Sequence, residues 1–217
     1  MELWELWLTF ITNGIDFLSA YLGVSEALAI IVFTLLSRML LMPLSLKSSY
    51  LMYKNRLAVE KIRPEVERLR EIYSDNPGEL AKRTMAIYKK NGIRFIDRTS
   101  IMNIGSQGIL GISMFQALRN MAFSSKFIWI ADIAKPDVIL AFMVGVLTFA
   151  SMLIMPGTVE QQNFLMLFIP TVVVMFVLAS FPSALGLYWA TSNAVTIVQT
   201  LVLRVVLERE DRVAGGG

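Results

Sequence analysis

The chain of 217 residues is long enough for one ordinary domain, or for about five membrane-spanning helices of ~20 apolar residues each with a modest polar part. Hydrophobic residues make up 55% of it and charged residues 17%, and its mean hydropathy is +0.59, which is too apolar for a typical soluble domain. The absence of Cys and His excludes disulfides and thiolate metal sites, and it removes the most common general base.

The net charge of +3 hides a strong segregation of charge. Residues 47–98 hold thirteen of the twenty Lys and Arg residues against seven acidic ones, a net charge of +6. A basic stretch between apolar segments predicts the cytoplasmic side of a membrane. Nucleic acid is a weaker alternative partner, because acidic residues interrupt the basic ones.

Residues 1–23 are predicted to form an amphipathic interfacial helix that ends at Gly23. Apolar residues recur at steps of three and four, and the polar residues lie largely on the other side. The stripe comprises Trp4, Leu8, Ile11, Ile15, Leu18 and Leu22. A signal peptide is the alternative, but the segment opens with Glu2 and Glu5 where a signal peptide needs positive charge.

The next segments are a first span at residues 24–46 and a cytoplasmic helical hairpin at residues 47–98. The hairpin turn is predicted from Asn76 as the helix cap, Pro77 at the first helical position and Glu79 at the third.

Four further spans follow. They are predicted at residues 99–119, 138–156, 164–180 and 184–207, separated by an external loop at 120–137 and a cytoplasmic loop at 157–163. Residues 208–217 form a charged tail, in which the last three glycines are interpreted as a cloning remnant. With the hairpin inside, alternation places the amino terminus outside and the carboxyl terminus in the cytoplasm.

Polar residues in the spans fall on three helical faces and predict a hydrophilic groove with Arg38 at its centre. The predicted groove residues are Thr34, Arg38, Ser45, Asn103, Ser106, Gln107, Ser113, Trp189, Ser192, Asn193, Thr196 and Gln199. Two alternatives stay open: Arg38 snorkels to the inner headgroups, and the small polar residues bond helix to helix.

Several stretches of the sequence carry recognisable motifs. In residues 37–47 an Arg is followed by apolar residues, Pro-Leu and a basic residue. The most specific motif is Phe181-Pro182 followed by Leu187-Tyr188-Trp189, Ser192-Asn193 and Gln199. These motifs resemble the first and fifth core spans of the YidC/Oxa/Alb family of membrane protein insertases. Residues 64–90 are similar to the family's cytoplasmic hairpin, and residues 127–137 to its loop before the third span.

The resemblance covers about residues 24–207 and implies an all-α integral membrane protein with five transmembrane helices around a hydrophilic groove. Arg38 would be the groove arginine and Trp189 the groove aromatic residue. The family's second-span Gln-x-Pro is missing, and Gln107 stands about one turn earlier.

The implied function is that of an insertase and chaperone in the bacterial inner membrane, without enzymatic activity, cofactor or metal. Nascent membrane proteins and the lipid bilayer are the expected partners, the ribosome and the Sec translocon are further candidates, and no nucleic-acid recognition is expected. A non-catalytic scaffold or assembly factor is the first alternative. An anion channel or transporter that uses Arg38 is the second, and an intramembrane enzyme is the least favoured.

Overall fold

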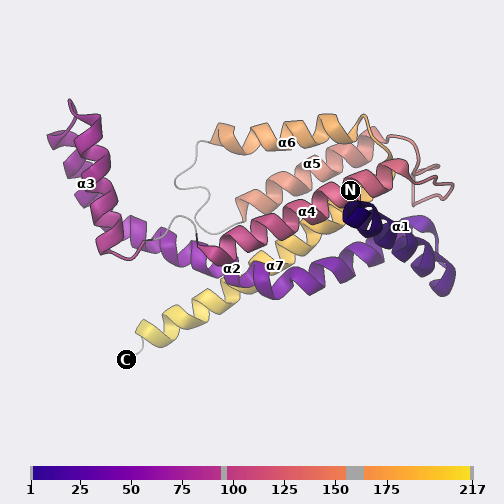
Figure 1. Cartoon of the computed structure of the whole chain (residues 1–217), viewed down its shortest axis with the longest axis horizontal. Coiled ribbons are helices and arrows are strands. Elements are labelled where there is room, and N and C mark those ends of the chain that lie inside the picture. The colour runs from indigo at the N-terminus through magenta and orange to yellow at the C-terminus, as the bar shows by residue number, and fades with distance from the viewer. Residues whose placement is uncertain (1, 94–96, 155–163, 216–217) are drawn as a thin grey trace. The chain divides into compact units, whose positions relative to one another are not determined.

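The computed structural model describes residues 2–93, 97–154 and 164–215, and in these ranges it is built from helices with no strand. The helices are α1 (Glu2–Leu22), α2 (Glu26–Ile72), α3 (Pro77–Lys90), α4 (Arg98–Asn120), α5 (Val138–Leu153), α6 (Phe164–Leu178) and α7 (Ser183–Gly215) (Figure 1). The all-α fold class is therefore confirmed. The predicted loop at 157–163, the end of the predicted span at 155–156, and residues 94–96 and 216–217 lie outside the described ranges.

The chain divides into two compact units. Unit 1 comprises residues 1–43 and 105–217, and unit 2 comprises residues 44–104. The divisions fall inside α2 and inside α4.

The core of unit 1 takes residues from α1, α2, α4, α5, α6 and α7, and within it α5 packs against both α6 and α7. Two glycines permit close approach. A Cβ at Gly145 of α5 would lie 2.3 Å from Met175 Cγ of α6, and one at Gly186 of α7 would lie 2.6 Å from Leu140 Cδ2 of α5. Helices in a bilayer gain no hydrophobic drive to associate, so such close contacts supply much of the attraction.

Helix α1 packs the middle of its apolar stripe on unit 1. Ile11 and Ile15 are fully buried, and Leu8 and Leu18 pack against the same core. Trp4 Nε1 donates to Gln116 Oε1 of α4 at 2.8 Å. Other large apolar residues of α1 stay exposed, so the helix has a protein-facing stripe and a second, free apolar surface. These exposed residues are Leu3, Leu6, Trp7, Phe10, Phe17, Tyr21 and Leu22.

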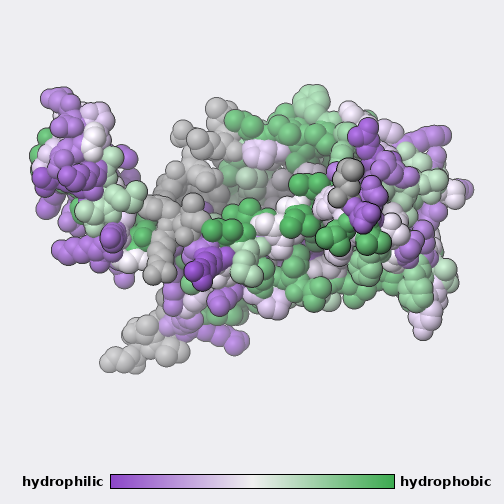
Figure 2. Space-filling model, viewed as in Figure 1, coloured by the Kyte–Doolittle hydropathy of each residue, from purple (hydrophilic) through white to green (hydrophobic). Residues whose placement is uncertain are grey.

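The outer surface of unit 1 is strongly apolar, as the green surface of α6 in Figure 2 shows. By length and composition, α2 and the Ser183–Glu210 part of α7 could each cross a membrane, and α5 and residues 167–178 of α6 are shorter apolar helices. Among the described helices, α4, which was predicted as the second span, belongs neither to those that could cross a membrane nor to the shorter apolar ones. Its polar residues, such as Asn103, Gln107 and Gln116, lower its hydropathy.

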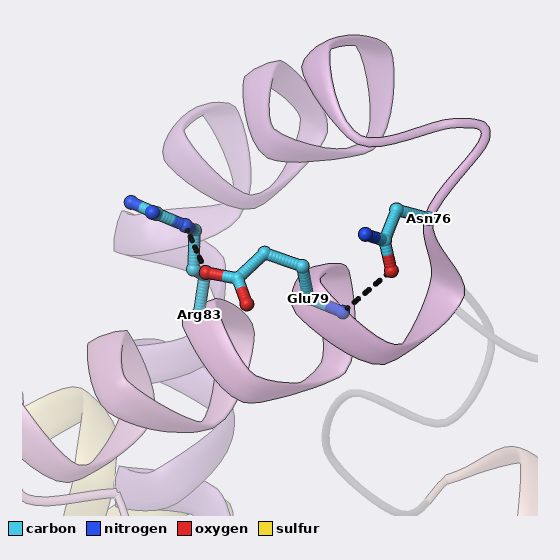
Figure 3. Close-up of polar contacts among 3 residues, drawn as sticks. All are labelled: Asn76, Glu79 and Arg83. Atoms are coloured by element: carbon cyan, nitrogen blue, oxygen red, sulfur yellow. Dashed lines mark hydrogen bonds and ion pairs between the residues drawn. The ribbon is translucent and has the colours of Figure 1, made fainter.

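Unit 2 contains the predicted hairpin turn, and its helix cap is confirmed. Asn76 Oδ1 accepts a hydrogen bond from Glu79 N at 3.1 Å, with Pro77 at the first helical position (Figure 3). The Glu79 carboxylate does not reach back to the cap but accepts from Arg83 Nε at 2.9 Å. Most of the surface of α3 is polar (Figure 2).

The start of α4 has a cap that the sequence analysis missed. Asp97 accepts from the Ser100 backbone N–H at 3.0 Å and from its hydroxyl at 2.8 Å. These hydrogen bonds, the hydroxyl's first, lower the pKa of the Asp97 carboxyl because they stabilise its charged form.

Two helices continue beyond the predicted ends of their spans. A single helix, α2, runs from the predicted first span through Pro43 into the hairpin, and α7 continues to Gly215, through most of the predicted tail. Both predicted boundaries were placed where apolar residues give way to charged ones. A change in polarity alters the preferred solvent of a helix but does not end it.

Candidate functional site

Arg38 of α2 is buried, with 7% of its surface exposed, and α4 and α7 hold its guanidinium group. Its Nη1 donates to Gln107 Oε1 of α4. Its Nη2 donates to Thr196 Oγ1 and, at 3.2 Å, to the Ser192 carbonyl oxygen, both of α7. Arg38, Gln107, Ser192 and Thr196 thus come together as the sequence periodicity predicts, and we call these four residues the arginine site.

The arginine site is electrically unbalanced. All three acceptors are neutral, and none of the ion pairs found among the described residues includes Arg38. Arg38 Nε is buried and has no hydrogen-bond partner within that part of the chain. A buried cation with an unused donor favours an incoming acceptor that carries negative charge.

Local helix geometry aims the α7 acceptors at Arg38. Ser192 and Thr196 stand four residues apart, so they share one face of α7. The Thr196 hydroxyl donates to the Ser192 carbonyl at 3.0 Å, which leaves its oxygen lone pairs to accept from Arg38. One turn of α7 therefore presents two acceptors to one nitrogen.

Beside the arginine site lies a pocket of about 500 Å³ between α4, α6 and α7. Gln107 and Ser192 belong both to its lining and to the arginine site, so the two are continuous. The full lining is Gln107, Gly108, Gly111, Ile112, Phe115, Val177, Tyr188, Trp189 and Ser192. Apart from the polar groups near Arg38, the lining is largely apolar and suits a hydrocarbon-like occupant.

Tyr188 and two glycines of the pocket were not predicted as site residues. Tyr188 entered the sequence analysis only as part of a motif, yet its side chain is 7% exposed and lines the pocket next to Trp189. A Cβ at Gly111 would lie 3.7 Å from the Tyr188 hydroxyl oxygen. Gly108 and Gly111 stand three residues apart on α4, and this spacing of small residues could have indicated that α4 leaves room for a pocket.

Several predicted groove residues form hydrogen bonds with partners other than Arg38. Thr34 and Ser113 are buried and donate to carbonyls of their own helices, Ile30 at 2.7 Å and Leu110 at 3.0 Å. Asn193 Nδ2 donates to Thr148 Oγ1 of α5 at 2.7 Å, as expected of a helix-to-helix bond.

The remaining predicted groove residues are spread over both units. Gln199 is buried on α7 and Ser106 is half-buried on α4, both in unit 1, whereas Ser45 and Asn103 belong to unit 2. Among the described residues no group of three or more His, Cys, Asp or Glu side chains could hold a metal ion.

Comparison with known proteins gives the family. A family model described as "60Kd inner membrane protein" matches residues 17–210. The chain is 26% identical over 190 residues to the membrane protein insertase YidC of Clostridium tetani, covering 83% of this chain and 82% of that protein. It is 29% identical over 228 residues to the membrane protein insertase MisCA of Bacillus subtilis, covering 98% and 85% of the two chains.

A longer relative matches over only part of its own length. The chain is 29% identical over 215 residues to the membrane protein insertase YidC of Campylobacter jejuni, and this match covers 94% of the present chain but 39% of that protein. The range matched by the family model, residues 17–210, includes every residue of the arginine site and of the pocket lining. The chain therefore belongs to the 60Kd inner membrane protein family, which is the YidC/Oxa/Alb family that its motifs resemble.

Proposed function

We propose that this protein is a membrane protein insertase that moves short polar tails of client proteins through a hydrophilic groove open to the cytoplasm. The client's apolar segment then leaves sideways into the bilayer. The observation that carries the proposal is Arg38, a buried guanidinium held only by neutral acceptors among the described residues. The names of the relatives, membrane protein insertases, support the same function.

The proposed membrane arrangement has five spans, with the amino terminus outside and the carboxyl terminus in the cytoplasm of a bacterium. The apolar helices α2, α5, α6 and α7 and the basic residues of the hairpin support it. Nascent membrane proteins are the clients, and the exposed charges of α3 would meet a ribosome or a Sec translocon in the cytoplasm.

The physical task is to bring a polar tail across ~30 Å of hydrocarbon, where each unsatisfied backbone polar group costs several kcal/mol. Polar groups that reach part of the way across shorten the dry path. The acceptors and donors of the arginine site can replace water for a tail that passes them.

Attraction to the tail has to be reversible. A carboxylate in the tail would bind Arg38 at Nε and compete with Ser192 and Thr196 for the adjacent Nη2, which exchanges neutral acceptors for a charged one. Hydrogen bonds to charged groups contribute about 1.5–3 kcal/mol. When the client leaves, Gln107, Ser192 and Thr196 can again accept hydrogen bonds from Arg38. The client is therefore attracted without being trapped.

The test is insertion of a single-spanning client with an acidic external tail into liposomes that contain the wild-type protein or Arg38→Ala. Protection of the tail from added protease measures insertion. We expect wild type to stimulate insertion and Arg38→Ala to lower it roughly 10-fold or more, since 1.4 kcal/mol corresponds to a factor of ten.

The matched control is Arg204→Ala, which removes the same side chain from an exposed position on α7. A client whose tail carries Asn and Gln in place of Asp and Glu is the second control. If acidic and neutral tails lose insertion equally in a folded Arg38→Ala protein, Arg38 does not act through charge. If folded wild type stimulates no insertion, the scaffold alternative replaces the insertase.

A further inference from the structure

The connection between α4 and α5 contains a tight turn at Phe127–Ile130. Phe127 N donates to Ile130 O at 2.9 Å, and Ile130 N donates to Phe127 O at 2.7 Å, so Ile128 and Trp129 are the two central residues. Ile128 has φ +49°, and it is the one non-glycine residue with positive φ in the described part of the chain. A positive φ at the first central position alone is the pattern of a type II′ turn, which favours Gly there.

The turn therefore combines backbone strain with exposed apolar side chains. A β-branched residue in the left-handed region is a true outlier, and Ile128 is also 79% exposed. Trp129 beside it is 43% exposed. In water both features are unfavourable, because the strain is not offset by any burial of the side chain.

The base of the turn is held firmly in place. Ile130 and Ile133 are buried in the core of unit 1, and Ile133 N donates to Ser125 O at 3.1 Å. Glu26 of α2 accepts from the backbone N–H groups of Ser124 and Ser125 at 3.0 and 3.2 Å. The buried residues and hydrogen bonds at the base of the turn thus hold the exposed Ile128 and Trp129 in a fixed position at its tip.

The tip lies level with the start of an exposed apolar helix face. Trp129 Nε1 donates to Asp137 Oδ1 at 3.4 Å, and Asp137 is the N-cap of α5. From there the exposed apolar residues of α5 run along the helix as Val138, Ile139, Phe142, Met143 and Val146. Trp prefers the level at which an apolar span meets the headgroups, because its ring is apolar and its N–H needs a polar partner.

We propose that Ile128 and Trp129 form an interfacial anchor, whose side chains insert into the bilayer at the boundary between the lipid headgroups and the acyl chains. Ile128 is removed from water by lipid, and Trp129 keeps its indole N–H on Asp137 at the polar level. The exposed Lys126, one residue before the turn, suits contact with lipid phosphates. The anchor fixes the depth of the connection between α4 and α5, whichever leaflet it faces.

The test reads Trp129 fluorescence in a protein that carries Trp4→Phe, Trp7→Phe and Trp189→Phe, so that Trp129 is its single tryptophan. The protein is reconstituted into phosphatidylcholine–phosphatidylglycerol vesicles with lipids brominated either near the glycerol end or near the methyl end of the acyl chain. We expect strong quenching by the shallow bromines and weak quenching by the deep ones. Quenching by aqueous iodide without bromine quenching would overturn the anchor and indicate a tip in water, free for a protein partner.

Ile128→Gly in the same background is the matched variant, since Gly suits the turn better while it removes one apolar side chain. We expect its bromine quenching to fall, and unchanged quenching would overturn the role of Ile128. If the three Phe substitutions disturb folding, single-cysteine variants replace them, because the chain has no native Cys. A nitrobenzoxadiazole label at Trp129→Cys should emit at shorter wavelength than one at the exposed Ala81→Cys of α3, and equal emission would overturn the proposal.

Discussion

Gln107 accepts a hydrogen bond from Arg38 Nη1 through its amide oxygen, and this contact can be tested by substitution. Gln107→Glu replaces this neutral acceptor by a carboxylate of nearly the same shape. We expect the internal ion pair to compete with carboxylates of the client, so that insertion of acidic tails falls roughly 10-fold while the folded protein stays at least as stable. Liposome insertion and thermal unfolding in detergent measure the two effects.

Gln107→Ala is the informative companion. It leaves a buried Arg38 N–H without its acceptor and should lower the free energy of unfolding by about 1–3 kcal/mol, with insertion of acidic tails retained in the folded fraction. The two variants therefore move stability and insertion in opposite directions. If Gln107→Glu inserts acidic tails as efficiently as wild type, the charge of Arg38 does not attract the client's carboxylates.

At this scale the sequence predicts which residues share a face but not what each side chain binds. Arg38, Gln107, Ser192 and Thr196 were all predicted as groove residues, because periodicity places a residue on one side of its helix. Asn193, one residue after Ser192, follows the same stripe but bonds Thr148 on α5. The difference depends on a rotation of about 100° per residue and on which helix is the neighbour, and only the packed structure supplies the latter.

Among the elements, the packing of α5 against α6 can be tested at Gly145, where an added Cβ would meet the Met175 side chain. Gly145→Ala would bring a Cβ within 2.3 Å of Met175 Cγ and 2.6 Å of its Sδ, so the Met175 side chain or one of the helices has to shift. We expect a loss of about 1–3 kcal/mol in the free energy of unfolding, as for other overpacked cores. Thermal or denaturant unfolding in detergent gives the value.

Gly105→Ala is the control, because no atom lies within 4 Å of a Cβ placed at Gly105 of α4. Ala favours a helix over Gly by up to about 1 kcal/mol, so this variant should be neutral or slightly stabilised. Equal stability of the two variants would mean that α5 and α6 do not pack as closely as the structure shows.

The helices themselves were largely predictable, and two of them continue beyond their predicted spans for a physical reason. No Gly stands between Gly23 and Gly78, and α2 continues through Pro43 and Pro64, so the change in polarity after residue 46 does not end the helix. The Asn76-Pro77 signal, in contrast, is local chemistry and marked the start of α3 correctly. The Asp97 cap of α4 was not predicted.

For the whole molecule, the proposed topology puts the hairpin and the connection before α5 on opposite sides of the membrane. Ala81→Cys on α3 and Ala131→Cys after the Ile128–Trp129 turn are exposed positions for a membrane-impermeant maleimide. In intact cells we expect labelling at position 131 but not at 81, and labelling at both after permeabilisation. Labelling of both positions in intact cells would rule out the predicted span at residues 99–119.

The hydrogen bonds at one end of unit 1 have a mechanical consequence. There Glu26 ties the start of α2 to Ser124 and Ser125, and the Ser183 hydroxyl ties the start of α7 to the Lys135 carbonyl at 2.6 Å. Because these bonds hold the helices together at that end, we expect the helices to separate more readily at the opposite end. For α5, 16 residues and ~24 Å long, a tilt of about 10° would move the far end by about 4 Å and leave these hydrogen bonds intact.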